Sequence, residues 1–325
     1  MYIALDAMGG DYAPQETIAG ALAALDSDLS LKLYLVGDQA LIQKELDKFS
    51  YDKDRIKIHH CTEVITMDDN PLVKKPDSSI NQGLLLVKQG KAAAFVSAGN
   101  TGALMGNSLL IYGRIQGIKR PAIATTIPKS NGYFLLLDSG ANSESKPENL
   151  KQFAYLGTIF YQEVNGIKNP KLGILNIGTE KKKGPKEIQE LYNILSSDTT
   201  INFQGNIEGN SLFFSDIDIV IADGFVGNIV LKILEGFAYY MLSYLKDIFK
   251  NTEDLDPIIA KKILSGLVKK LDSSEYGGGL LLGVDGITVK AHGSSNRKAI
   301  SNVLQYANKL SQSKAINKFK ENFKK

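Results

Sequence analysis

Short apolar runs alternate with longer amphipathic stretches along almost the whole chain. Apolar runs of strand length predict β-strands, and apolar residues that recur every three or four positions predict helices. Strands are expected at 2–5, 31–36, 56–60, 92–96, 121–127, 133–137, 171–175, 217–222 and 287–291, and helices at 39–49, 78–90, 100–115, 147–165, 227–250 and 257–271. This alternation predicts an α/β fold with a mostly parallel sheet flanked by helices.

A turn signal and the lack of linkers add detail to this picture. Residues 129–132, Lys-Ser-Asn-Gly, separate two strand-like runs and predict a hairpin, so part of the sheet is expected to be antiparallel. No linker, low-complexity tract or repeat interrupts residues 1–325. We therefore expect a single unit of two interleaved lobes.

The run 92–96 leads into a loop of small and polar residues at the start of a predicted helix. The loop residues with candidate chemistry are Ser97, Gly99, Asn100, Thr101 and Gly102. Unpaired N–H groups at a helix N-terminus, beside the positive end of the helix dipole, bind anions. A tight turn with an N-cap residue explains the same pattern. Both interpretations stay open for one loop taken alone.

Similar loops follow other predicted strands. They contain glycine together with Asp, Asn, Ser or His, at 6–11, 138–142, 176–179, 223–228 and 292–296. In an α/β protein the carboxyl ends of parallel strands gather at one edge of the sheet, where ligands bind. We therefore expect these loops to converge on one cleft.

Composition restricts the class of protein. The 38 basic and 35 acidic residues give a net charge of +3, which is too balanced to indicate a nucleic-acid partner. A single cysteine, Cys61, excludes an intramolecular disulfide and is typical of a reducing compartment. No apolar run of 18 residues predicts a membrane span, and the chain opens directly on a strand without a signal peptide. A cytoplasmic protein is expected.

Several catalytic motifs are missing. The chain has no G-x-G-x-x-G, no G-x-x-x-x-G-K-[ST] and no G-x-S-x-G, which argues against a Walker-type nucleotide site and a serine nucleophile. The histidines are His59, His60 and His292, and with one cysteine they leave little for a metal site, so none is expected. His59 and His60 point to opposite faces of one strand and are interpreted as packing or surface residues. His292 lies in a loop and is the candidate acid or base, with a structural hydrogen bond as the alternative.

The segment at about 227–271 departs from the alternation. Its two predicted helices carry wide apolar stripes, the first through Ile229, Ile233, Phe237, Tyr240, Met241, Tyr244, Leu245 and Ile248. Ordinary intrachain core is one explanation. We prefer a protruding helical hairpin that packs against a symmetry mate. Around its tip lie Leu255, Ile258, Ile259, Lys261, Lys262, Lys269 and Lys270, a pattern typical of contact with a membrane surface or an acidic protein, although a solvated face explains the lysines equally well.

A set of short motifs, taken together, carries a resemblance to a known protein family. They are 4–11 with Ala13 and Pro14, 97–105, Gly113-Arg114, 120–122, Asp138 with 140–142, 146–148, 176–178, Lys183-Gly184, 223–225 with Gly227 and Asn228, and His292-Gly293. In this order they span nearly the whole chain and resemble the bacterial phosphate acyltransferase family.

The resemblance implies a fold like that of isocitrate and isopropylmalate dehydrogenases, and a homodimer. It implies that an acyl group passes from acyl-acyl-carrier protein to inorganic phosphate, giving acyl phosphate for phospholipid synthesis without a cofactor. It also implies a peripheral membrane association that delivers acyl phosphate to a membrane glycerol-phosphate acyltransferase.

Phosphate would be the nucleophile, so the protein must cradle a dianion and stabilise an oxyanion. The candidate catalytic residues are His292, Lys183 and Asn228. The candidate substrate-binding residues are Gly9, Gly10, Asp11, Ser97, Gly99, Asn100, Thr101, Gly102, Asp138, Asn142, Asn176, Gly178 and Gly227. Because unpaired carboxylates repel phosphate, Asp6 and Asp223 are assigned structural roles, whereas Asp11 and Asp138 are expected to line the site.

Three other functions fit parts of the pattern. A phosphotransacetylase-like enzyme would use acyl-CoA at the same kind of anion site. A metal- and NAD-dependent decarboxylating dehydrogenase would need clustered carboxylates and an arginine clamp, whereas Asp6, Asp11, Asp138 and Asp223 fall one to a loop. A non-enzymatic lipid-binding or scaffold protein would use the helical hairpin alone.

Overall fold

The computed structural model describes residues 1–71, 73–252, 256–271 and 278–324. The strands are β1 (Tyr2–Asp6), β2 (Lys32–Gly37), β3 (Ile56–His60), β4 (Ala92–Ser97), β5 (Ala122–Pro128), β6 (Tyr133–Leu137), β7 (Lys171–Asn176), β8 (Asn202–Glu208), β9 (Ile219–Ile221), β10 (Gly279–Leu282) and β11 (Thr288–Lys290). The α-helices are α1 (Gln15–Ser27), α2 (Gln39–Leu46), α3 (Ser79–Lys88), α4 (Thr101–Tyr112), α5 (Pro147–Asn165), α6 (Lys186–Ser196), α7 (Gly224–Lys250), α8 (Pro257–Leu271), α9 (Arg297–Gln312) and α10 (Ala315–Phe323).

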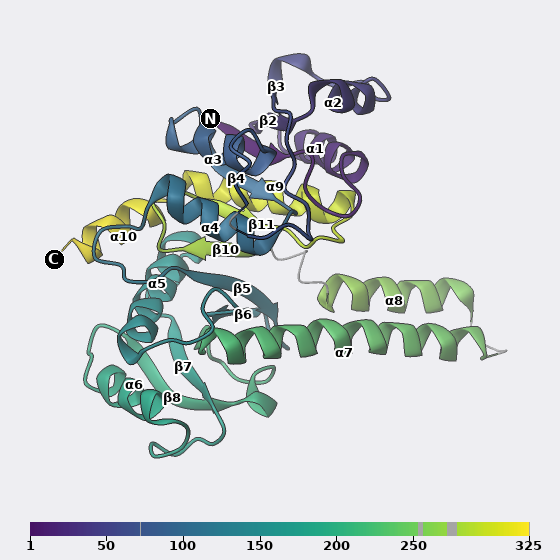
Figure 1. Cartoon of the computed structure of the whole chain (residues 1–325). Helices are drawn as coiled ribbons and strands as arrows, with labels where there is room; N and C mark the ends of the chain where they lie inside the picture. The colour runs from purple at the N-terminus through teal and green to yellow at the C-terminus, as the bar shows by residue number, and fades with distance from the viewer. Residues whose placement is uncertain (72, 253–255, 272–277, 325) are drawn as a thin grey trace.

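These strands form one sheet in the order β3-β2-β1-β4-β11-β10-β5-β6-β9-β7-β8, with helices packed along it (Figure 1). Strand β10 is antiparallel to both its neighbours, and β5 and β6 form the predicted hairpin. The other pairings between these strands are parallel. The α/β class and the mostly parallel sheet are therefore confirmed.

The two halves of the sheet run in opposite directions. Because β11 and β5 are each antiparallel to β10, they share one direction with β1, β2, β3 and β4. The reversal at the β5–β6 hairpin gives β6, β9, β7 and β8 the opposite direction. The carboxyl ends of the two groups therefore point toward opposite edges of the sheet.

Both faces of the sheet are covered, which is the usual arrangement for parallel strands. Along β1, Ile3 and Leu5 pack into one apolar cluster with α1 and α9, whereas Ala4 packs into another with α3 and α4. This division follows from the alternation of side chains along a strand. The packing fixes the carboxyl ends of β1 and β4 between two helical layers.

Some boundaries differ from the predictions. The helix expected at 100–115 ends at Tyr112, because Gly113 takes a positive φ of 76° and its N–H closes the last turn on Leu109. The helix expected at 39–49 ends at Leu46. Strand β10, Gly279–Leu282, was not predicted. Its sequence of glycine and three leucines has no alternation because both of its faces are covered.

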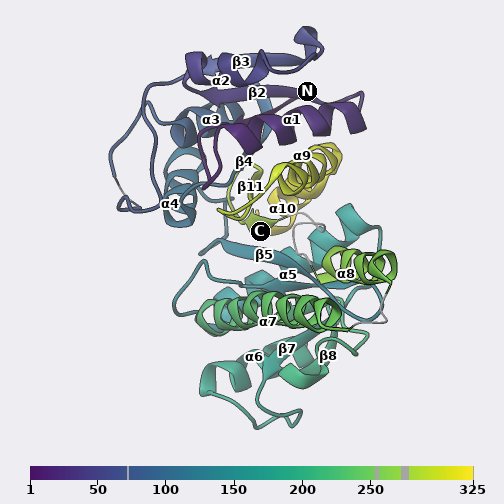
Figure 2. The ribbon, with the colours of Figure 1, turned by 90° about the vertical axis from the view of Figure 1, so that its right-hand side faces the viewer.

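Helices α7 and α8 form a hairpin that projects from the body (Figure 1), seen nearly end-on in Figure 2. Only Gly224 and Gly227 are buried along α7. Contrary to the sequence prediction, α7 is long and apolar enough for a membrane span by length and composition, with mean hydropathy 1.3 in its most apolar 18-residue window, of which 6% is buried. Leu255 and the side chains of Lys269 and Lys270 lie outside the described residues.

Candidate functional site

The loops after β1 and β4 are joined through a buried carboxylate. Ser97 Oγ donates to Asp6 Oδ2 at 2.7 Å and accepts from the N–H of Gly99 at 3.0 Å. The N–H of Met8 donates to Asp6 Oδ1 at 3.1 Å. Burial raises the pKa of the Asp6 carboxyl, and the bond from Ser97 acts against that shift. A Cβ atom on Gly9 would lie 2.3 Å from Asp6 Oδ2, so the close approach of the two loops requires glycine.

The loop after β11 packs against the loops after β1 and β4. The N–H of Asp11 donates to the carbonyl oxygen of Gly293 at 2.8 Å. Gly10, with φ +106°, lies against Ala98 and Gly293 in a conformation that glycine adopts without strain. The side chain of Asp11 is exposed. The carboxyl ends of β1, β4 and β11 therefore form one continuous surface.

Asn100 uses its side chain to organise the start of α4. Its Oδ1 accepts from the N–H of Ala103 at 3.0 Å, which makes it the N-cap residue. Its Nδ2 donates to the carbonyl oxygens of the loop before α3, at Thr66, Met67 and Asp69. The polar atoms of Asn100 are thus engaged within the protein.

The Asp138 carboxylate is buried directly after β6. Its Oδ1 accepts from the N–H groups of Ile123, Gly140 and Ala141 at 3.0, 3.1 and 2.9 Å. Its Oδ2 accepts from the N–H and Nδ2 of Asn142 at 2.9 and 2.8 Å. Burial raises the pKa of Asp138, and these donors act in the opposite direction. Asp138 and Asn142, both predicted to line the site, are hydrogen-bonded to each other within this loop.

Helix α7 begins against the Asp138 loop. A Cβ atom on Gly227 would lie 1.9 Å from the carbonyl oxygen of Asp138, and one on Gly224 would lie 2.2 Å from that of Asn142. Asp223 caps the helix, in agreement with its predicted structural role. Glycine at these two positions lets the first turn of α7 reach the loop.

A small cavity of about 170 Å³ lies where α4, α7, β11 and the Asp138 loop meet. Its polar lining residues are Thr101, Thr125, Ser139, Asn228, Lys232, Glu235, Lys290, His292 and Ser295, and the glycines are Gly140, Gly278 and Gly279. Of the predicted catalytic residues, His292 and Asn228 therefore face one space, together with Thr101.

His292 faces α7 across this cavity. Its Nε2 lies 3.9 Å from Oε2 of Glu235, which also accepts from Lys232 Nζ at 2.7 Å. The N–H of Ser294 donates to Nδ1 at 3.3 Å, and Ser294 Oγ lies 2.8 Å from the same atom. These bonds assign the neutral ring a proton on Nε2. The imidazole is thus held so that it can donate a proton into the cavity.

Lys290 is a half-buried cation of the cavity. Its Nζ donates to the carbonyl oxygen of Ala291. Burial, followed by the charge of Lys232, lowers the pKa of Lys290 to about 8, against opposing contributions from Asp11 and Glu235. An anionic ligand bound beside this ammonium group would favour its charged form and raise its pKa. The site is therefore well suited to an anion.

A second, larger cavity of about 1320 Å³ lies on the other side of α7. It is lined partly by Asn176 and Asp223 at the carboxyl ends of β7 and β9, and by Phe225, Val226 and Val230 of α7. The first turns of α7 therefore separate two cavities, with Asn228 on one side and Val226 on the other.

Asn176, Gly178 and Lys183 lie together in the loop after β7. Asn176 Nδ2 donates to the carbonyl oxygen of Lys183 at 3.1 Å, and Gly178 lies against the Lys183 side chain. Lys183 is half exposed, 4.0 Å from Glu180, and does not line the smaller cavity.

The expectation that all the loops converge on one cleft is wrong. The reversal between β5 and β6 sends Asn176 and Asp223 to the larger cavity, whereas Thr101 and His292 line the smaller one. The loop after β6 still reaches the smaller cavity through Gly140, which packs against Asn228.

The sequence predicted no site role for six polar residues that line the smaller cavity, namely Thr125, Ser139, Lys232, Glu235, Lys290 and Ser295. Lys290 ends a strand-like run and carries no motif of its own. Lys232 and Glu235 lie on α7, whose apolar stripe predicts an interface and gives no sign of a polar cavity. Their one available signal was proximity in sequence to the motifs at His292 and Asn228.

His59 and His60 line neither of the two cavities. His59 Nε2 lies 3.1 Å from Gln82 Oε1, and His60 Nδ1 accepts from the N–H of Gln39 at 3.1 Å, so both have structural partners. Within the described ranges, no three His, Cys, Asp or Glu side chains gather as a metal site.

Comparison with known proteins shows which family the chain belongs to. The model of the fatty acid synthesis protein family matches residues 1–318. The phosphate acyltransferase of Halothermothrix orenii is 44% identical and aligns over 100% of this chain and 99% of its own length. The phosphate acyltransferase of Heliobacterium modesticaldum is 48% identical, with 94% and 93% covered.

Solved structures share the fold. A phosphotransacetylase from Streptococcus pyogenes has a TM-score of 0.63 at 17% identity, over 95% of this chain and 94% of that one. The EutD phosphotransacetylase from Staphylococcus aureus has a TM-score of 0.61 at 14% identity, with 96% and 94% covered. Given the match of the family model and the full-length identity to its relatives, the chain belongs to the phosphate acyltransferase family and is an acyltransferase.

Proposed function

We propose that this protein transfers a fatty acyl group from acyl-acyl-carrier protein to inorganic phosphate, forming acyl phosphate for phospholipid synthesis. The observation that carries the proposal is the smaller cavity, where Lys290 and His292 face Asn228 and the start of α4 in a space suited to a small anion. The family relationship supports acyl transfer as the reaction type.

The proposed step needs only the two substrates. An oxygen of HPO₄²⁻ attacks the thioester carbonyl carbon, the C–S bond breaks, and the phosphate proton passes to the departing thiolate. The parent thiol has a pKa of about 8.5, so the thiolate is a good leaving group near neutral pH. In this proposal the Nε2–H of His292 donates to the developing charge, and the ring then recovers the proton from phosphate; the Ser294 N–H bond to Nδ1 supports the proton's location on Nε2.

The acyl donor is the part of this proposal that most needs a test. The purified protein is given inorganic phosphate and the same acyl group on acyl carrier protein or on coenzyme A, and acyl phosphate is measured. We expect turnover with the carrier-protein thioester to be far faster. Turnover only with acyl-CoA would instead make the protein a phosphotransacetylase-like enzyme, and no acyl phosphate from either donor would reject the reaction.

We also propose that α7 joins two copies of the chain into a homodimer. Seven of its exposed apolar side chains follow a spacing of three and four residues, which places them on one face. They are Val226, Ile229, Ile233, Phe237, Tyr240, Tyr244 and Ile248. The rings of Tyr240 and Tyr244 are stacked with centroids 6.1 Å apart. A continuous apolar stripe of this length on a projecting helix is typical of a covered interface.

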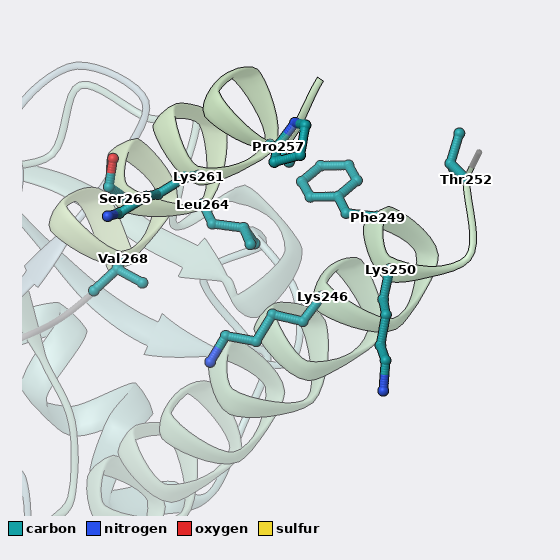
Figure 3. Close-up of a pocket in the computed structure, with 10 residues that line it drawn as sticks. Lys246, Phe249, Lys250, Thr252, Pro257, Lys261, Leu264, Ser265 and Val268 are labelled. Carbon is teal, nitrogen blue, oxygen red and sulfur yellow. The ribbon is translucent and has the colours of Figure 1, made fainter. Parts of the chain in front are cut away.

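The outer part of the hairpin is proposed to contact the acidic carrier protein and the membrane surface. Between α7 and α8 lies a groove of about 710 Å³, which is lined by the apolar side chains of Phe249, Pro257 and Leu264 and by lysines that include Lys250 (Figure 3). Ile258 and Ile259 are exposed beside the exposed Lys261. Apolar residues with adjacent lysines suit an anionic surface. A cytoplasmic enzyme at the membrane would pass acyl phosphate to a membrane glycerol-phosphate acyltransferase.

A further inference from the structure

We infer that Lys290 and Ser295 bind the phosphate nucleophile in the smaller cavity, and that Lys290, not Lys183, supplies its positive charge. This inference rests on the proposed function and identifies the groups that hold its anionic substrate. It follows from the position, the charge balance and the unsatisfied hydrogen-bonding capacity of the cavity lining.

Lys290 occupies a central position. It pairs with Ser97 in the register of β11 and β4, so its backbone lies beside the loop that starts α4. Its side chain lines the cavity that Thr101, Asn228 and His292 share. An anion bound there would contact the first turn of α4, where the helix dipole adds to the attraction.

The charged groups around Lys290 leave its ammonium group available to pair with a bound anion. On α7, Lys232 and Glu235 form an ion pair at 2.7 Å. Asp11, in the loop after β1, is exposed and does not line the cavity. His292, two residues along, is directed toward Glu235. In the described part of the chain, Lys290 therefore has a carbonyl partner, Ala291, and no carboxylate partner within ion-pair distance.

Ser295 provides the second, independent observation. Only 8% of its surface is exposed, and it lines the same cavity. Its hydroxyl finds no hydrogen-bond partner among the described residues. A buried hydroxyl without a partner costs free energy, and a bound oxyanion would supply the missing acceptor. Its own N–H donates to the carbonyl oxygen of His292 at 3.0 Å, which holds the residue in place.

The titration of Lys290 supports this assignment. Burial lowers its pKa to about 8, and a dianion beside it would favour the charged form and raise that pKa. Phosphate affinity should therefore decline as the pH rises above 8 and Lys290 loses its charge. An arginine at this position stays protonated throughout that range, so Lys290→Arg should abolish the decline.

The test measures KM for phosphate in single variants of the full-length protein, with the acyl donor saturating. Lys290→Met is expected to raise this KM about 10- to 100-fold, and Ser295→Ala about 10-fold, because a charged ligand loses one hydrogen bond in each case. The matched control is Lys88→Met, since Lys88 also donates to a main-chain carbonyl, that of Tyr112, outside both cavities. It is expected to leave KM unchanged.

Comparison with Lys183→Met decides between the two lysines. An increase in phosphate KM for Lys183→Met, with none for Lys290→Met, would overturn the inference. So would a phosphate KM that rises above pH 8 equally in the wild type and in Lys290→Arg. Thermal unfolding of each variant identifies any that fails to fold, in which case Lys290→Arg and its pH profile carry the test.

Failure of this inference is distinguishable from failure of the proposed function. If the wild type forms no acyl phosphate from inorganic phosphate, the proposed function fails. If the wild type forms acyl phosphate and Lys290→Met keeps the wild-type KM for phosphate, the reaction stands and the assignment of Lys290 is wrong.

Discussion

The imidazole Nε2 of His292 lies 3.9 Å from Oε2 of Glu235, so the loop after β11 and helix α7 face each other across the smaller cavity. The two elements belong to different halves of the molecule. Their approach gathers a proton donor, the half-buried ammonium of Lys290 and helix N-terminal groups around a space of about 170 Å³. This arrangement leads to predictions about catalysis, packing and assembly.

The first prediction concerns His292 as acid and base. Substitution His292→Gln removes the proton-transfer group and should lower kcat by about 10²- to 10⁴-fold, with little change in KM for phosphate. Steady-state kinetics measure both constants. His60→Gln is the control, because His60 bonds to Gln39 outside the cavity. A kcat of His292→Gln close to that of the wild type would refute an acid–base role.

The second prediction concerns the contact between α7 and the Asp138 loop. In Gly227→Ala the new methyl group would lie 1.9 Å from the Asp138 carbonyl oxygen, so the helix must shift and activity should fall at least about 10-fold. Gly236→Ala on the same helix meets no atom within 4 Å and should raise the free energy of unfolding, by up to about 1 kcal/mol. Activity and thermal unfolding of the pair are compared. Equal behaviour of the two variants would contradict this packing.

The third prediction concerns stability at Asp138. Asp138→Asn places an amide among five N–H donors and should lower the free energy of unfolding by roughly 2–4 kcal/mol. The same substitution at Asp223, the N-cap of α7, should change it by less than about 0.5 kcal/mol, since Asn and Asp cap helices equally well. Denaturant unfolding gives both values. A stable Asp138→Asn protein with altered phosphate KM would return Asp138 to the site-lining role predicted from sequence.

The fourth prediction concerns the dimer. Phe237 is 59% exposed on the apolar face of α7, and Phe237→Glu would bury a charge at the proposed interface, so a monomer is expected. Tyr239 is 78% exposed on another face of the same helix, and Tyr239→Glu should remain dimeric. Sedimentation equilibrium measures the mass of each. Retention of the dimer by Phe237→Glu, or a monomeric wild type, would reject this interface.

Local patterns predicted most of the fold. The sequence around β4 and α4 shows why, since an apolar run, a polar loop and an N-cap residue, Asn100, determine that unit within a few residues. Strand β10 was missed because Gly279–Leu282 becomes a strand only through its neighbours β11 and β5. The direction of the second half of the sheet depends on the same distant pairing, and so does the division of the loops between two cavities.

The candidate site was predicted only in part, because local patterns reveal some of its residues and the tertiary structure brings in the others. His292 and Asn228 stand in glycine-containing loops or helix starts, which sequence patterns reveal, and they do face one cavity. Lys183 also stands beside a glycine but belongs to the loop after β7. Lys290 and Ser295 became visible only through burial, because neither the low pKa of one nor the unpartnered hydroxyl of the other has a sequence signature.

The most direct test of the central claim follows the phosphate oxygens. The protein is given acyl-acyl-carrier protein with phosphate labelled at every oxygen with ¹⁸O, and the products are analysed by mass spectrometry. Attack of phosphate on the thioester predicts acyl phosphate that keeps all the labelled oxygens, together with free carrier protein. Free fatty acid without label, and no labelled acyl phosphate, would contradict the account by showing that water is the nucleophile.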